Sequence, residues 1–229
     1  MTTRIKVLYE DSNILAIDKP SGILVHPDKV SKEETIYDIF KKKFPKLEVA
    51  HRLDRETSGV MLLAKNTKAH EFLKKQFSGR TIKKIYVAIV NGNMKNDRGV
   101  INKPIGRSPA DFRRHSAGRG ARGEMREAIT EYKVLKRFTS PQPSPYKGEG
   151  GKFTYLEVRP KTGRTHQIRV HMKYLNHPVA YDSLYNPDGV CPKGLKRMAL
   201  HAKSIEFTNL KGDTIKVESK VPKEFLALV

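Results

Sequence analysis

The chain has 229 residues, of which 38% are hydrophobic, which is enough to build a core in one large or two small domains. Lysine and arginine total 45 against 24 acidic residues, so the formal net charge of +21 indicates a polyanionic partner, most simply a nucleic acid. The sequence lacks the long apolar run of a membrane span or a secretory signal, and its single cysteine, Cys191, excludes an intrachain disulfide, so a cytosolic protein without membrane contact fits.

The first elements are extended. Residues 6–9 and 14–17 read as two strands joined by a polar turn, and the run 18–22, Asp-Lys-Pro-Ser-Gly, interrupts the pattern. Residues 23–27 then read as a short extended piece. Apolar positions at helical spacing predict an amphipathic helix over 35–44 that ends at a proline.

Residues 51–59, His-Arg-Leu-Asp-Arg-Glu-Thr-Ser-Gly, place one carboxylate, Asp54, between Arg52 and Arg55. The apolar run 60–64 that follows is typical of a buried strand, so the polar segment lies at the edge of a core element. The arginine charges keep Asp54 ionised, and an ionised, positioned carboxylate can act as a nucleophile. For an isolated Arg-x-Asp, a surface salt-bridge cluster on a turn is the simpler interpretation.

Residues 67–77 predict a second amphipathic helix, closed by glycine, and residues 82–92 predict a strand that contains Tyr86. A tyrosine in such a strand usually packs and finds one hydrogen bond. The strand pattern alone therefore assigns Tyr86 no catalytic or binding role.

Residues 98–126 combine arginines with glycines and prolines, which predicts a basic arm and not a core element. One interpretation is a mobile, solvated loop; the other, which we favour, is a clamp that binds phosphates without reading sequence. The arginines are Arg107, Arg113, Arg114, Arg119, Arg122 and Arg126.

Strands are predicted over 128–138 and 153–158, on either side of a Pro/Gly-rich insert at 139–151. Such a composition cannot pack a core, so we expect the insert to be exposed and dispensable for chemistry. A strand then ends at Pro160, and a helix is predicted from about residue 165 to 175.

Arg164 lies at this junction of strand and helix, where its charge can point into a cleft. His166 and His171, with His51, invite a metal-site interpretation. We reject it, because the two residues are five apart whereas the common zinc pair on a helix is spaced i, i+4. We favour the interpretation that these histidines make hydrogen bonds near a positive groove.

The remaining chain predicts strands over 197–207 and 214–217 and a short helix over 223–228. Many strands with a few irregularly placed helices favour an α+β fold with a mixed or largely antiparallel sheet.

Several of these segments resemble the pseudouridine synthases of the RluA family, which isomerise uridine in RNA. The similar motifs are the opening Asp-Lys-Pro-x-Gly, the nonapeptide around Asp54, Lys-x-Tyr-x-Ala-x-Val around Tyr86, and Thr-Gly-Arg-Thr-His-Gln-Ile-Arg-x-His around Arg164. One departure is Tyr181, because the family usually has a glycine immediately before Asp182.

The resemblance covers nearly all of residues 1–229 and implies the pseudouridine synthase fold. That fold is α+β, with a central mixed, mostly antiparallel sheet, flanking helices and a cleft, in a single catalytic domain. Because the similarity starts almost at residue 1, we expect no small amino-terminal RNA-binding domain of the S4 type.

The resemblance also implies roles for individual residues. Asp54 is expected to be the catalytic aspartate, Tyr86 to stack on the target base, and Arg164 to bond to Asp54. The uridine must leave the RNA stack to reach Asp54, which costs a few kcal/mol, and Arg52 is placed to fill the gap or hold the backbone. The RNA-binding residues are expected to be Arg52, Arg55, Arg107, Arg113, Arg114 and Arg119.

We expect no metal and no cofactor, because cleavage of the C–N bond and formation of the C–C bond occur within one bound nucleotide. Whether Asp54 attacks the sugar or the base, or a glycal forms, stays open. We expect a monomer acting on structured RNA, with ribosomal and transfer RNA both open. The rival hypotheses are a non-catalytic RNA-binding or ribosome-assembly protein and a metal-dependent hydrolase that uses the histidines.

Overall fold

The computed structural model describes residues 5–27, 33–118, 121–140 and 151–229. The chain divides into two compact units, Met1–Lys84 with Ala202–Lys220 and Ile85–His201 with Val221–Val229. Each unit is built from strands with few helices, so the predicted α+β class is confirmed. The expectation of a single catalytic domain and of a cleft stays a prediction.

The first unit is a sheet with the strand order β1-β2-β3-β11, and β12 pairs with β11. The pairs β1/β2, β2/β3 and β11/β12 are antiparallel. All seven residues of β3 are buried, as the apolar run after Asp54 predicts for a central strand. The strands are β1 (Lys6–Glu10), β2 (Ile14–Lys19), β3 (Ser58–Ala64), β11 (Leu200–Thr208) and β12 (Thr214–Glu218).

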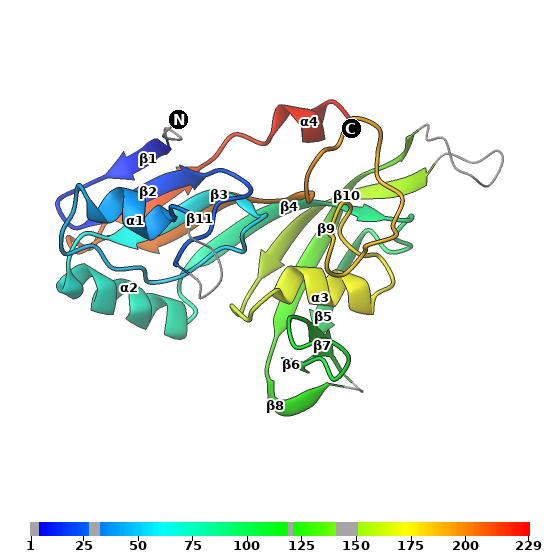
Figure 1. Cartoon of the computed structure of the whole chain (residues 1–229), viewed down its shortest axis with the longest axis horizontal. Helices are drawn as coiled ribbons and strands as arrows, with labels where there is room; N and C mark the ends of the chain where they lie inside the picture. The colour runs from blue at the N-terminus through cyan, green and yellow to red at the C-terminus, as the bar shows by residue number, and fades with distance from the viewer. Residues whose placement is uncertain (1–4, 28–32, 119–120, 141–150) are drawn as a thin grey trace. The chain divides into compact units, whose positions relative to one another are not determined.

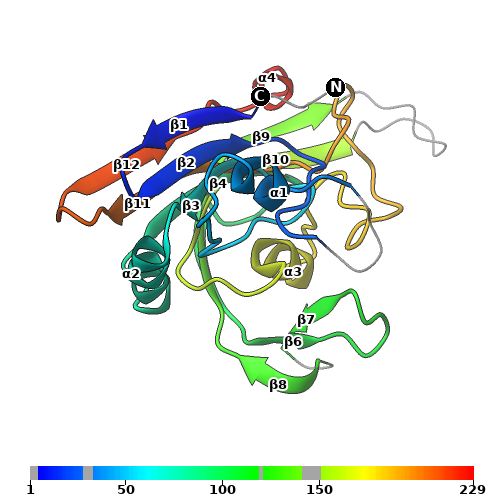
Figure 2. The same cartoon turned by 60° about the vertical axis from the view of Figure 1, so that its left-hand side comes forward.

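Two helices, α1 (Ile36–Lys41) and α2 (Thr67–Ser78), belong to this unit. Figures 1 and 2 show α2 lying along one face of its strands, where the α2 residues Ala69 and Leu73 pack into the core beside Leu62 of β3. Helix α1 is shorter than the predicted span 35–44, although Thr35 caps it with the expected kind of side-chain hydrogen bond.

The second unit has a sheet with the order β4-β10-β9-β5, in which every neighbouring pair is antiparallel. Helix α3 packs on this sheet through Ile168 and Met172, and the short helix α4 adds Phe225 to the same core. The elements are β4 (Lys83–Asn91), β5 (Arg98–Asn102), β9 (Ile129–Ser140), β10 (Gly151–Pro160), α3 (Gln167–Tyr174) and α4 (Lys223–Leu226).

The basic arm is shorter than the sequence indicates. Residues Arg98–Asn102 form the sheet strand β5, whose Ile101 is buried. The rest is a small three-stranded sheet with β6 (Ile105–Arg107) between β7 (His115–Ala117) and β8 (Arg122–Arg126). Figures 1 and 2 show it on the far side of α3 from the four-stranded sheet. This small sheet, residues 105–126, is called the arm below.

The Pro/Gly-rich insert separates β9 from β10, and its residues 141–150 lie outside the described residues. The flanking residues Ser140 and Gly151 are direct Cα partners in the antiparallel ladder. This geometry is the one that a two-residue hairpin turn connects.

We therefore expect that replacing residues 141–150 with Asn-Gly keeps the fold. A type I′ turn suits directly paired ends. The shorter loop also lowers the entropic cost of closing the loop, by roughly 1 kcal/mol in free energy. Urea unfolding should show one transition, and the free energy of unfolding should equal or exceed that of the parent protein. The matched Ala-Ala replacement should be less stable, and equal stability of the two would contradict the turn geometry.

Candidate active site

A buried lysine supports the segment that carries Asp54. Lys19, at the end of β2, is 0% exposed, and its Nζ donates to the carbonyl oxygens of Pro20 and Arg55, each at 2.9 Å. A buried ammonium group is tolerated only when such bonds replace its water. Lys19 therefore fixes the backbone one residue after Asp54.

The Asp-Lys-Pro-x-Gly turn makes two more bonds to the same segment. The Gly22 amide donates to the Arg55 carbonyl at 2.9 Å, and the Ser21 hydroxyl donates to the Glu56 carbonyl at 2.7 Å. Gly22 has φ +91°, a conformation that favours glycine. Two motifs that lie 30 residues apart in the sequence thus form one hydrogen-bonded structure.

Gly59, the last residue of the nonapeptide, has no room for a side chain. Its φ is +108°, and an added Cβ would lie 2.2 Å from the backbone oxygen of Ala202 in β11. The glycine therefore allows β3 to approach β11 closely where the Asp54 segment enters the sheet.

The side chains around Asp54 alternate as an extended backbone requires. Arg52 is exposed, Leu53 is buried with 4% exposure, and Asp54 is half-buried. His51 anchors the start of the segment, because its Nε2 accepts the Leu62 amide at 2.9 Å. Desolvation and the nearby Lys84 charge lower the pKa of His51 to about 3, so it stays neutral at ordinary pH.

Arg55 has partners within the protein. Its Nε donates to the Gly22 carbonyl at 3.0 Å, and its guanidinium pairs with Glu33 at 2.7 Å. These contacts give Arg55 a structural role that the sequence did not indicate. Its assignment as an RNA contact stays a prediction.

Tyr86 and Arg164 belong to the second unit. Tyr86 lies in β4 opposite Val158 of β10 and is half-buried against the core. Arg164 follows β10, and its Nε donates to the carbonyl of Glu127 at 2.9 Å, just beyond the arm. Asp54 lies in the first unit, so its pairing with Arg164 and the base contact of Tyr86 stay predictions.

The conformation of the Arg164 loop depends on Gln167, a residue that the sequence analysis did not select. Its Oε1 accepts both the Arg164 amide at 2.9 Å and the Thr162 hydroxyl at 2.7 Å. Its Nε2 donates to the Ile129 carbonyl at 3.0 Å. Helix α3 begins at Gln167, later than predicted, because His166 has a left-handed φ of +55°.

A buried ion pair joins α3 to the loop that follows it. Arg169 is bidentate to Asp182 at 2.7 and 2.8 Å, and Asp182 also accepts the amide of Tyr185. Tyr181, which stands where the family usually has glycine, has φ +60°. The tyrosine therefore adopts a backbone conformation that glycine favours, and the loop keeps that shape.

Tyr185 connects this loop to the arm. Its hydroxyl oxygen accepts the His115 amide of β7 at 2.9 Å and hydrogen-bonds with Nδ1 of His166 at 2.9 Å. Its ring packs with Ile105 of β6 and Val170 of α3. Tyr185 therefore links the arm, through His166, to the end of the loop that carries Arg164.

The predicted RNA-binding arginines of the arm have different surroundings. Arg107 is exposed, whereas Arg113 makes a bidentate pair with Asp111 and Arg114 lies 3.4 Å from the same carboxylate. The Arg113 bonds lower the pKa of Asp111 to about 2, so it is ionised at neutral pH. Arg119 lies outside the described residues.

His171 is held inside the protein. Its Nε2 donates to the Lys103 carbonyl at 3.0 Å, so its Nδ1 accepts from the Thr130 hydroxyl at 2.8 Å. Burial lowers the pKa of His171. In the described part of the chain, no three His, Cys, Asp or Glu side chains gather as a metal site would require. None of the helices in those ranges has the length and apolar character to cross a membrane.

Residues 13–174 match the family model described as RNA pseudouridylate synthase. The chain is 35% identical over 243 residues to ribosomal large subunit pseudouridine synthase D of Xanthomonas campestris pv. campestris, covering 98% of this chain and 68% of that protein. It is 35% identical over 235 residues to the protein of the same name from Borreliella burgdorferi, covering 97% and 67%. The chain thus spans about two thirds of the length of these relatives.

Solved structures show the same fold. The human RNA pseudouridylate synthase domain containing 1 superimposes with a TM-score of 0.78 at 25% identity, covering 95% of this chain and 83% of that one. The human RNA pseudouridylate synthase domain containing 4 gives a TM-score of 0.71 at 26% identity, covering 96% and 90%.

We expect Lys19→Met to destabilise the protein by about 1–3 kcal/mol, because the carbonyl oxygens of Pro20 and Arg55 lose the ammonium donor while the side-chain length is kept, and the Arg55 oxygen retains only the Gly22 amide. Urea unfolding with circular dichroism measures the change. The matched control is Lys68→Met on the exposed face of α2, which should shift stability by less than about 0.5 kcal/mol. A Lys19→Met protein as stable as the control would show that the lysine does not hold the segment.

Proposed function

Since the chain belongs to the RNA pseudouridylate synthase family, and is an enzyme that isomerises uridine to pseudouridine in RNA, we propose that Asp54 is its catalytic carboxylate. The observation that carries this proposal is the fixed loop that presents a half-buried Asp54 within the matched residues 13–174. A rigid loop suits the reaction, since the carboxylate must meet one carbon or one proton of a uridine in a defined position.

Tyr86 and Arg164 complete the proposed site. Tyr86 has an aromatic ring, half-buried in a rigid strand, which is the type of group on which an extruded base stacks. Arg164 is held by its amide and its Nε, so its guanidinium has a limited range of directions. In this proposal it orients Asp54. Arg52, exposed two residues before Asp54, fills the gap that the uridine leaves.

We propose large-subunit ribosomal RNA as the substrate. Two relatives at 35% identity are named for that activity, and the charge of +21 supplies the affinity for a polyanion. The site of action would then be the cytoplasm, where a monomer acts on the RNA. Mapping pseudouridines in the RNA of cells that lack the protein tests this directly. If these cells lose a pseudouridine from transfer RNA alone, transfer RNA is the substrate and the proposal of ribosomal RNA is wrong.

We expect Asp54→Asn to abolish pseudouridine formation while the Kd for RNA changes by less than about threefold, because the amide keeps the size of the side chain but cannot act as a nucleophile or base. The assay uses ribosomal RNA from cells that lack the enzyme, with pseudouridine read by chemical mapping. Glu56→Gln, a neighbouring carboxylate in the same loop, is the control and should keep activity. Turnover by Asp54→Asn at the rate of the parent would exclude this role.

The arm is the proposed phosphate-binding surface, with Arg107, Arg113 and Arg114 among its described cations. Its attachment through Tyr185 and Glu127 to the Arg164 loop would place bound phosphates at a constant distance from that loop. Asp111 competes with phosphate for Arg113 and Arg114. The affinity of the arm for RNA is therefore set by this carboxylate as well as by the arginines.

Opposite changes in the arm should have opposite effects. Asp111→Asn should tighten RNA binding, because it releases two guanidinium groups, and Arg113→Gln with Arg114→Gln should weaken binding and flatten the dependence of log K on log salt. Filter binding at several salt concentrations measures both. Lys211→Gln, on an exposed turn of the first unit, serves as a single-charge control. An unchanged salt slope in the double variant would remove the arm from the RNA-binding surface.

A further inference from the structure

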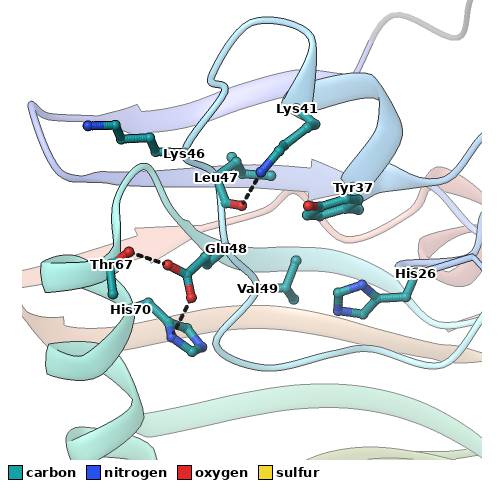
Figure 3. Close-up of a pocket in the computed structure, with 9 residues that line it drawn as sticks. All are labelled: His26, Tyr37, Lys41, Lys46, Leu47, Glu48, Val49, Thr67 and His70. Carbon is teal, nitrogen blue, oxygen red and sulfur yellow. Dashed lines mark hydrogen bonds and ion pairs between the residues drawn. The ribbon is translucent and has the colours of Figure 1, made fainter.

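A pocket of about 630 Å³ lies in the first unit between α1 and the start of α2 (Figure 3), and no residue of the Asp54 segment lines it. Its volume is within the range of about 300–1,000 Å³ that is usual for ligand pockets. Neither the proposed chemistry nor the sequence motifs account for it. Its lining combines aromatic rings with lysines, which is the composition of sites that bind single-stranded nucleic acid.

Two rings form one wall of the pocket. His26 and Tyr37 lie 5.6 Å apart between ring centroids, with 34° between their planes. Burial, and then the positive charge of Arg52, lowers the pKa of His26, so the imidazole is neutral at neutral pH. A neutral ring next to a tyrosine is a suitable surface for stacking a nucleobase.

Two lysines belong to the lining, and one of them, Lys41, stands near these rings. The Nζ of Lys41 is 5.3 Å from the centroid of the Tyr37 ring and 3.5 Å from the Leu47 carbonyl oxygen. Lys46, in the turn after α1, is exposed at the edge of the pocket. A base stacked on Tyr37 would therefore have the Lys41 ammonium group within reach of its phosphate, whereas Lys46 stands at the other end of the pocket (Figure 3).

The one carboxylate in the lining, Glu48, faces away from the rings. It accepts the Thr67 hydroxyl at 2.6 Å and pairs with Nδ1 of His70 at 2.9 Å, both on α2. In Figure 3, Val49 lies between Glu48 and the two rings. The charge of Glu48 is thus held on the α2 side and does not oppose a phosphate beside Lys41. Asp38 of α1, whose charge also acts on His26, is bonded to the amide and hydroxyl of Thr35 and is not part of the lining.

We propose that this pocket binds a second nucleotide of the RNA substrate, near the target uridine in the strand, with its base on Tyr37 and His26, its phosphate at Lys41, and the adjoining phosphate of the strand at Lys46. The inference rests on the proposed function for the identity of the RNA. The pocket would add affinity and choice of site, because only an RNA with an unpaired nucleotide at the right distance from the uridine can fill both positions. The isomerisation step itself does not use it.

The first experiment compares Tyr37→Leu with Tyr37→Phe. Loss of the ring should weaken RNA binding by about tenfold, whereas the phenylalanine variant should bind like the parent. The rate at saturating RNA should stay unchanged in both variants, so that in the leucine variant KM rises and kcat does not. Equal RNA affinities for the leucine variant and the parent would overturn the proposal. Because the phenylalanine protein controls for folding, a loss in both variants with normal unfolding curves would also overturn it.

The second experiment tests the lysines by charge-matched pairs. Lys41→Gln with Lys46→Gln should reduce the salt slope of binding by about 1.4, or about 0.7 per lost contact to single-stranded RNA. The control pair, Lys42→Gln with Lys68→Gln, removes the same charge from exposed positions outside the pocket and should leave the slope unchanged. Equal slopes for the two pairs would show that only overall charge matters.

The third experiment identifies the occupant. RNA substrates in which single nucleotides near the converted uridine are made abasic should include one that binds the parent about tenfold more weakly, and Tyr37→Leu should not weaken that RNA further. If the losses of affinity caused by the abasic nucleotide and by Tyr37→Leu add at every position, no RNA base occupies the pocket. Conversion of the uridine by the parent is measured in parallel. A parent that converts no uridine, while these binding differences persist, refutes the proposed function and leaves the pocket assignment standing.

Discussion

One buried ammonium group holds the loop that carries the proposed catalytic acid. Lys19 gives up its hydration to bond two carbonyl oxygens, and one of these belongs to the residue after Asp54. Bonds from the Ser21 hydroxyl and the Gly22 amide complete the structure. Because a carboxylate that reacts with one atom must be held within a fraction of an ångström, the strand end and the nonapeptide form one functional element.

The second unit supports its proposed residues in a similar way, with buried polar groups behind each exposed one. Gln167 fixes the Arg164 loop, and the Arg169–Asp182 pair fixes the loop that presents Tyr185. Since breaking a buried charge pair leaves an uncompensated charge, this loop has few alternative positions. Tyr185 in turn holds the arm. The basic surface is therefore attached to the scaffold by hydrogen bonds close to the Arg164 loop.

Much of the fold could be predicted from periodicity. The apolar run after Asp54 is the buried strand β3, and the helical spacing of residues 67–77 is α2. What periodicity missed has physical causes. Strand β5 was assigned to the arm because it contains a single buried residue, Ile101, between exposed residues, and one buried position gives no alternating pattern. Lys19 and Gln167 were missed because a polar side chain near a turn gives no sign of whether it points outward or into the protein.

The sequence by itself determined the family, the α+β class and the candidate residues Asp54, Tyr86 and Arg164, because these lie in contiguous motifs whose residue types and spacing can be compared directly. Only the tertiary structure decided which polar groups hold those motifs in place, since Lys19 reaches Arg55 and Tyr185 reaches His115 across long separations in the chain. It also decided that Tyr37, Lys41 and His26 line one pocket. Such contacts depend on how strands and helices pack, which no local pattern of residues records.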